Sequence, residues 1–219
     1  MQEQDSLITQ LFENEELTDK QKKILLAAID SFSEKGYAAT STSEIAKKAG
    51  VAEGTIFRHY KTKKDLLLGI IAPFLAKSIA PFVIKDLFKV IDTKYERYED
   101  FLRAIIQNRV EFLQKNLPIV KILIQEVPFH PELKDQFLEH IAIKLIERFK
   151  KLVEDYQSKG QILKMPTSSV IRMNLTTIFG YFITRHILLP DANWNDEEEI
   201  ERTVQFLLHG LSPKAEGSD

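Results

Sequence analysis

Apolar residues recur every three or four positions along almost the whole chain, which is the period of an amphipathic helix. Residues 22–35 follow this pattern and end at Gly36, a natural C-cap. No segment alternates with the period of a strand, so the pattern predicts an all-α fold. Beyond residue 67 it predicts helices at about 98–116, 119–127, 132–158, 168–189 and 196–211.

The segment 41–60 predicts two short helices joined by a tight turn. Ser41 can cap the first helix while Glu44 reaches back to it, so that two otherwise unpaired amides find acceptors. Gly50 falls where that helix must stop and the chain must take a positive φ. Val51 then fills the turn.

The second of these helices begins near Ala52 or Glu53 and turns Ile56 toward the first helix. Its opposite side exposes Thr55, Arg58 and His59. This arrangement is typical of a helix-turn-helix that places its second helix in the major groove of DNA. An ordinary helical hairpin with a glycine in its turn is the alternative.

The flanking residues extend the pattern, because Thr62 and Asp65 predict a capping box for the next helix. Residues 22–67 closely resemble the DNA-binding domain of the TetR family of bacterial transcription regulators. The residues that carry this resemblance are Ala28, Phe32, Gly36, Tyr37, Thr40, Ile45, Ala46, Ala49, Gly50, Val51, Gly54, Thr55, Phe57, Tyr60, Lys61, Lys63, Leu66 and Leu67.

Two positions depart from the usual family pattern, which has serine at Ala52 and most often tyrosine at Phe57. Ala52 cannot cap the recognition helix with its side chain, and Phe57 has no hydroxyl to offer to a phosphate. The resemblance implies that the protein binds double-stranded DNA at a palindromic operator. The expected DNA contacts are Thr42, Ala52, Glu53, Thr55, Phe57, Arg58, His59, Tyr60 and Lys63.

The positive charge of the chain is concentrated on this motif. The net charge is −2 overall, yet residues 18–72 hold ten lysines and arginines against six acidic residues. Residues 1–17 hold five acidic residues and no basic one, so we expect no DNA contact there. Six cations flank the expected recognition helix and can neutralise phosphates, namely Lys47, Lys48, Arg58, Lys61, Lys63 and Lys64.

We expect residues 1–17 to form an extension, either a short extra helix or an arm, and residues 18–66 the DNA-binding domain. Residues 67–211 form a helical effector-binding and dimerisation domain, and 212–219 a frayed tail. The chain has no cysteine, which excludes disulfides and cysteine-ligated zinc. It also lacks the ~18–20 consecutive apolar residues of a membrane span, and its start is too acidic for a secretory signal. We therefore expect a cytoplasmic protein.

The resemblance implies a small-molecule effector inside the larger domain, and the phenylalanines there suit an apolar ligand or an ordinary core. Arg109 lies beside an apolar stripe, so its guanidinium needs either an anionic ligand or an internal acid such as Glu126. Asn174 is a similar polar candidate on an apolar helix. The expected ligand contacts are Ile105, Arg109, Phe112, Gln125, Asn174 and Ile178.

The resemblance also implies a homodimer built from the last two long helices. Gly180, in the middle of one of them, suits a close helix crossing, either with a second subunit or within one subunit. The expected interface residues are Gly180, Phe182, Ile183, His186, Val204, Leu207 and Leu208.

The sequence gives little support for an enzymatic function, because the chain has no phosphate loop, nucleophile elbow or His-Glu-x-x-His pair. Its five histidines lack metal-ligand spacing, and we expect no cofactor and no metal. We therefore predict a TetR-like DNA-binding regulator, a repressor released by a small molecule. The alternative is a protein of the same fold that scaffolds DNA or docks a protein partner and takes no small effector.

Overall fold

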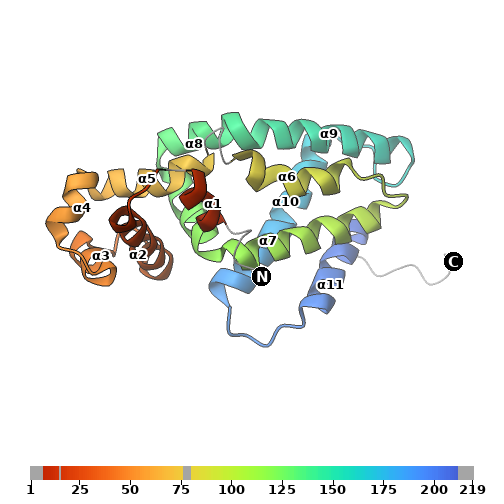
Figure 1. Ribbon diagram of the computed structural model, residues 1–219. Coiled ribbons are helices and arrows are strands. Elements are labelled where there is room, and N and C mark those ends of the chain that lie inside the picture. The colour runs from red at the N-terminus through yellow and green to blue at the C-terminus, as the bar shows by residue number, and fades with distance from the viewer. Residues whose placement is uncertain (1–6, 15, 76–79, 212–219) are drawn as a thin grey trace. The chain divides into compact units, whose positions relative to one another are not determined.

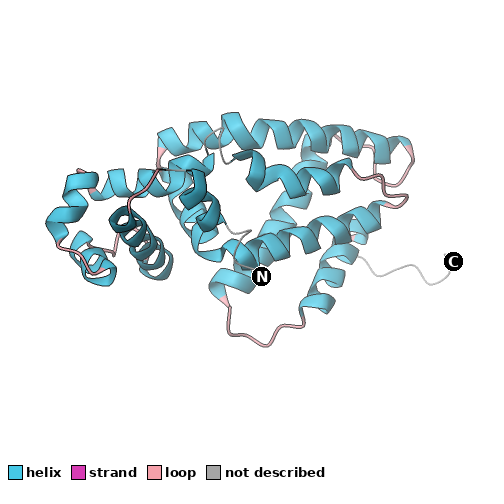
Figure 2. Cartoon of the chain, in the orientation of Figure 1, coloured by secondary structure: helices cyan, strands magenta, loops and turns pink. Residues whose placement is uncertain are grey.

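The computed structural model describes residues 7–14, 16–75 and 80–211, and every regular element in them is helical (Figures 1 and 2). Among these residues, no helix is both long and apolar enough to cross a membrane. The tail at 212–219 lies outside the described residues. The α-helices are α1 (Leu7–Asn14), α2 (Asp19–Lys35), α3 (Thr42–Ala49), α4 (Glu53–His59), α5 (Lys63–Leu75), α6 (Ala80–Asp92), α7 (Tyr98–Glu126), α8 (Pro131–Phe137), α9 (Ile143–Ser158), α10 (Thr167–Ile183) and α11 (Asp196–His209).

The chain divides into two compact units. The first contains residues 1–85 and 112–143, and the second contains residues 86–111 and 144–219. Helix α7 therefore contributes its first part to the second unit and its last part to the first. The expected boundary after residue 66 does not coincide with this division and stays a prediction about function.

Helix α2 begins three residues earlier than its apolar pattern predicts. Thr18 is its N-cap, and the Thr18 hydroxyl accepts a hydrogen bond from the Gln21 amide at 3.3 Å. The Gln21 side chain in turn accepts one from the Thr18 amide at 3.0 Å. This capping box extends the helix over a polar first turn that hydrophobic spacing does not reveal.

Helix α7 bends at Asn116, close to the restart that Pro118 predicts. Asn116 has the non-helical angles φ −127° and ψ 18°. Its buried side chain donates to the Phe112 carbonyl at 2.8 Å and accepts from the Leu7 amide, also at 2.8 Å. Asn116 at the kink therefore caps helix α1. This helix lies in the N-terminal extension, so the extension contains a short helix.

The long helix expected at 132–158 is interrupted. A π-helical turn at Leu138–Ala142 separates α8 from α9, and a 3-10 turn at Val127–Phe129 precedes α8. A π turn inserts an extra residue and rotates the preceding face. Phe137, the last residue of α8, is 37% exposed.

In the second unit, α7 and α9 contribute most of the hydrophobic core, and α10 and α11 pack beside each other. Tyr98, Phe101 and Tyr156 form an aromatic cluster with ring centroids 5.1–6.4 Å apart. Helix α10 runs into a second π-helical turn at Thr184–Leu188. Val204 of α11 is fully buried against this core.

Candidate nucleic-acid interface

Helix α3 has the capping box that its sequence predicts. The Ser41 hydroxyl accepts from the Glu44 amide and the Glu44 carboxylate accepts from the Ser41 amide, both at 3.1 Å. Lys35 also contacts this carboxylate at 2.8 Å. The hydrogen bond from Lys35 is the main cause that lowers the pKa of Glu44 to about 2. The ammonium of Lys35 is thus directed to the start of α3.

The turn between α3 and α4 has the predicted conformation. Gly50 lies in the left-handed region at φ 67° and ψ 35°, and the Val51 amide donates to the Ala46 carbonyl at 3.0 Å. A Cβ added at Gly50 would meet no atom within 4 Å. Glycine is required there by the backbone angles rather than by crowding.

We expect Gly50→Ala to lower the free energy of unfolding by about 1–2 kcal/mol, the cost of a left-handed residue with a Cβ. Gly54→Ala is the matched control, because Gly54 is also open to solvent but lies inside helix α4. It should raise stability by up to about 1 kcal/mol. Denaturant unfolding measures both, and equal effects of the two changes would contradict this account of the turn.

Helix α4 is positioned by one buried residue and one hydrogen bond. Ile56 is fully buried, and the Thr42 hydroxyl donates to the Glu53 carboxylate at 2.6 Å. Two expected DNA contacts, Thr42 and Glu53, therefore bind each other and join the starts of α3 and α4. Ala52 is the N-cap and provides no side-chain hydrogen bond, as its sequence predicts.

The outer face of α4 is open. Arg58 and His59 are exposed, and Phe57 is 45% exposed, a large fraction for an aromatic ring. Thr55 is half-buried beside them. A guanidinium can donate two hydrogen bonds to guanine and an apolar ring can contact the methyl group of thymine, so this face can read base edges.

Tyr60 lies behind this face, where its ring packs on Gly69 of α5. A Cβ added at Gly69 would lie 2.8 Å from Cε1 of Tyr60. The absence of a side chain at Gly69 therefore sets how closely the end of α4 approaches α5. The phosphate contact expected of Tyr60 stays a prediction.

Lys63 is engaged within the protein. Its Nζ donates to the carbonyls of Tyr37 at 2.8 Å, Ala38 at 3.4 Å and Thr40 at 2.9 Å. It also lies 4.4 Å from the centre of the Tyr37 ring. An ammonium has three donors, and all three are used here. Lys63 thus holds the loop between α2 and α3, and a phosphate contact would require these bonds to break.

Lys63→Met distinguishes the two roles, because methionine keeps the apolar stem and removes the ammonium. We expect the free energy of unfolding to fall by about 1–3 kcal/mol and the salt dependence of DNA binding to stay unchanged. Lys61→Met is the control and should show the reverse, a weaker salt dependence at unchanged stability. Calorimetry and a binding series in salt measure both. A weaker salt dependence in Lys63→Met would show that Lys63 contacts phosphate.

Other cations near α4 are also paired. Lys48 lies 3.5 Å from both Asp30 and Glu34, and Lys64 lies 2.5 Å from Glu132 at the start of α8. Within the described part of the chain, Lys47, Arg58 and Lys61 have no ion pair and are exposed. Three of the six expected cations are therefore open for phosphates.

A corner formed by the end of α7 and the start of α8 packs against the DNA-binding elements of the same unit. His130 approaches Tyr37 edge-on at 6.1 Å and lies 3.3 Å from the Glu126 carboxylate. With the pair of Lys64 and Glu132, this corner contacts both the start of α5 and the loop after α2. The start of α5 is capped as expected, because the Thr62 and Asp65 side chains each accept from the other's amide at 3.0 Å.

The effector contacts expected from the sequence stay a prediction. Arg109 bonds Asn108 at 2.6 and 3.0 Å, and its burial lowers its pKa to about 10. The Asn174 amide is used at both ends, since it accepts from the Tyr98 hydroxyl and donates to the Val170 carbonyl, each at 2.9 Å. The half-buried Asn174 therefore uses both ends of its amide within the protein. Of the rest, Ile105 is buried, Phe112 and Ile178 are half-buried, and Gln125 is exposed.

The expected dimer contacts differ in how far their side chains are buried within one protomer. Val204 is fully buried against the core of its own unit, which leaves no surface for a partner in this conformation. The inward stripe of α11 packs on the core of the second unit, to which α11 belongs, and Val204 lies in the middle of this stripe. Gly180 is exposed, and a Cβ added there would meet nothing within 4 Å. His186 is buried, while Phe182, Ile183, Leu207 and Leu208 are half-buried.

Comparison with known proteins decides the family. The model of "Bacterial regulatory proteins, tetR family" matches residues 24–70. A helix-turn-helix transcriptional regulator of Bacillus subtilis, YvkB, is 30% identical over 196 residues, which cover 87% of this chain and 96% of YvkB. The chain belongs to the TetR family of bacterial transcription regulators. It is a helix-turn-helix DNA-binding transcription regulator, and α4 is the recognition helix of the family pattern.

Two further transcriptional regulators are similar to most of the chain. The regulator AcrR of Shigella flexneri is 44% identical over 203 residues, which cover 89% of this chain and 90% of AcrR. The structure of FadR of Bacillus subtilis in complex with stearoyl-CoA covers 87% of this chain and 98% of FadR, with a TM-score of 0.61 and 21% identity. The first likeness covers both units, and the second shows the fold.

Proposed function

We propose that this TetR-family regulator is a homodimeric repressor that binds a palindromic operator and leaves it when a small molecule with apolar character binds the helical domain. The observation that supports the DNA contact is the open face of α4, where Arg58 and His59 are exposed beside Phe57. Two such helices related by a twofold axis reach successive major grooves of one duplex face.

The dimer is proposed from the outer face of α10. Met173 and Phe179 are 45% and 49% exposed, and Gly180 lies open beside them. Phe206 on the neighbouring α11 is 40% exposed. An apolar face with an open glycine suits a close crossing with the same helices of a second copy.

Release from the operator is proposed to act through the corner between α7 and α8. A ligand that moves α7 would also move His130 and Glu132. These two residues would displace Tyr37 and Lys64, because the side chains are in contact. The start of α5 would then shift, and the distance between the two recognition helices would change. Both could no longer enter their grooves at once.

Selection from a library of random duplexes tests this proposal. We expect an enriched inverted repeat with half-site centres about 34–36 Å apart, or a multiple of one helical turn. The full chain should protect this repeat with two protomers bound. Enrichment of a single asymmetric site, or of no sequence, would contradict the dimeric operator.

A further inference from the structure

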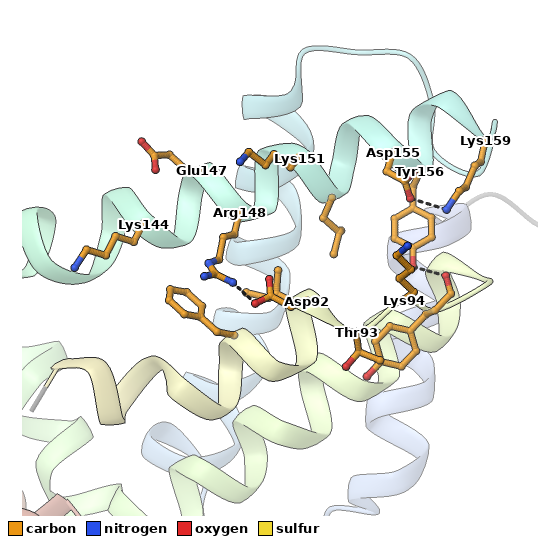
Figure 3. A pocket seen from close by; sticks show the side chains of 14 residues that line it. Asp92, Thr93, Lys94, Lys144, Glu147, Arg148, Lys151, Asp155, Tyr156 and Lys159 are labelled. Carbon is orange, nitrogen blue, oxygen red and sulfur yellow. Dashed lines mark hydrogen bonds and ion pairs between the residues drawn. The ribbon is translucent and has the colours of Figure 1, made fainter.

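A groove in the second unit is separate from every residue expected to bind an effector. It lies between the end of α6, the loop that follows it and one side of α9 (Figure 3). Its volume is about 760 Å³. Sites for small molecules commonly measure about 300–1,000 Å³, so the groove has the size of a ligand site rather than of a single ion.

The floor of the groove is apolar. Ile91 and Tyr156 are buried there, and Phe88 and Leu152 are half-buried. The Tyr156 hydroxyl donates to the Tyr95 carbonyl at 3.0 Å, which joins α9 to the loop after α6. The floor is therefore built from packed side chains on two fixed helices.

The rim is cationic. Lys94, Lys144 and Lys151 line the groove and are exposed, and among the described residues no carboxylate pairs with them. Glu147 of α9 also lines the groove, and Figure 3 shows its side chain directed away from α6.

The other charges of the rim are paired in the groove itself. Arg148 reaches across from α9 to form an ion pair with Asp92 of α6, and its guanidinium lies 3.9 Å from the centre of the Phe88 ring. Lys159 contacts Asp155 at 2.6 Å. These pairs cancel their own charges, and the three open lysines outnumber the one remaining carboxylate, Glu147, so the lining keeps a net charge of +2.

We propose that this groove binds an amphipathic anion, a small molecule with an apolar body that ends in a phosphate or carboxylate group. A neutral apolar molecule would leave the lysines without a partner, and inorganic phosphate would leave the floor exposed to water. Like charges along the edge of a low-dielectric cleft concentrate anions there, and Figure 3 shows Lys144 and Lys94 toward opposite ends of the groove. The apolar body would lie on Phe88 and Leu152, with its charged end at one of the rim lysines.

The binding step is independent of DNA, and only its consequence for transcription rests on the proposed function. Binding across α6 and α9 would fix the spacing of these two helices within the second unit. An anion in this groove is thus placed to act as the effector or as a second ligand beside it.

Titration calorimetry of the full chain without DNA tests the groove, with decyl phosphate below its micelle concentration as the probe. We expect binding to the wild type, and at least tenfold weaker binding when Lys94→Gln, Lys144→Gln and Lys151→Gln are combined. The matched control combines Lys20→Gln, Lys23→Gln and Lys134→Gln, three exposed lysines of the other unit. It should bind decyl phosphate as the wild type does.

Two further arms separate the contributions of charge and apolar surface. Decyltrimethylammonium has the same chain and the opposite charge, and we expect at least tenfold weaker binding of it. Leu152→Gln should weaken decyl phosphate binding while circular dichroism shows an unchanged helical content. Equal affinity of both triple variants, or equal binding of the cationic amphiphile, would overturn the proposal. Addition of decyl phosphate to the DNA complex then tests the regulatory consequence separately.

Discussion

Replacing Arg58 by alanine is expected to weaken operator binding by more than about 30-fold. Arg58 is exposed on α4 and has no ion pair among the described residues, so its guanidinium is available to a base edge. Loss of one such contact costs about 1–3 kcal/mol, and a dimer loses two of them. The effect should be largest at the operator position that Arg58 reads. Fluorescence anisotropy with operator variants measures it.

Lys20→Ala is the matched control for Arg58→Ala, because Lys20 is an exposed cation on α2, away from the recognition helix. It should change operator affinity by less than twofold and leave specificity intact. Arg58→Ala should keep the thermal stability of the wild type, since the removed side chain is exposed. Wild-type affinity in Arg58→Ala would show that α4 does not read the operator as we propose.

Phe179→Glu is expected to convert the dimer to monomers at micromolar concentration. The ring is 49% exposed in one protomer, so the change costs little in folding. An aromatic residue at the centre of an interface contributes about 2 kcal/mol or more, and each dimer contains two copies. The dissociation constant should therefore rise by about a thousandfold. Analytical ultracentrifugation measures the change directly.

Phe129→Glu is the control for Phe179→Glu. Phe129 is 79% exposed but lies in the 3-10 turn before α8, outside the proposed interface. It should remain dimeric and keep its operator affinity. A wild type that sediments as a monomer, or a Phe179→Glu variant that stays dimeric, would contradict the proposed interface on α10.

Features that depend on neighbours in sequence could be predicted from the sequence. The capping boxes at Ser41 and Thr62 each join residues three positions apart, and both are present. The left-handed Gly50 is likewise a local requirement. These local rules predict α3, the turn and α4, which together form the helix-turn-helix.

Features that depend on distant backbone atoms could not be predicted from the sequence. Lys63 bonds carbonyls 23 to 26 positions away, and Asn116 bonds the Leu7 amide 109 positions away. No residue type marks a carbonyl as an acceptor, because every residue has one. The charge of Lys63 and the family resemblance predict a phosphate contact, and neither reveals these carbonyl acceptors. The groove between α6 and α9 was missed for a related reason, since its lysines resemble an ordinary solvated face.

Binding of the purified protein to its own upstream DNA, followed by anisotropy across a salt series with scrambled duplex as competitor, tests the central claim most directly. Three open cations in each protomer, Lys47, Arg58 and Lys61, make six in a dimer. We predict sequence-selective binding in which log K falls against log salt with a slope of about −5. Binding no tighter than to scrambled duplex at every salt concentration would contradict the assignment of this chain as an operator-binding regulator that acts through α4.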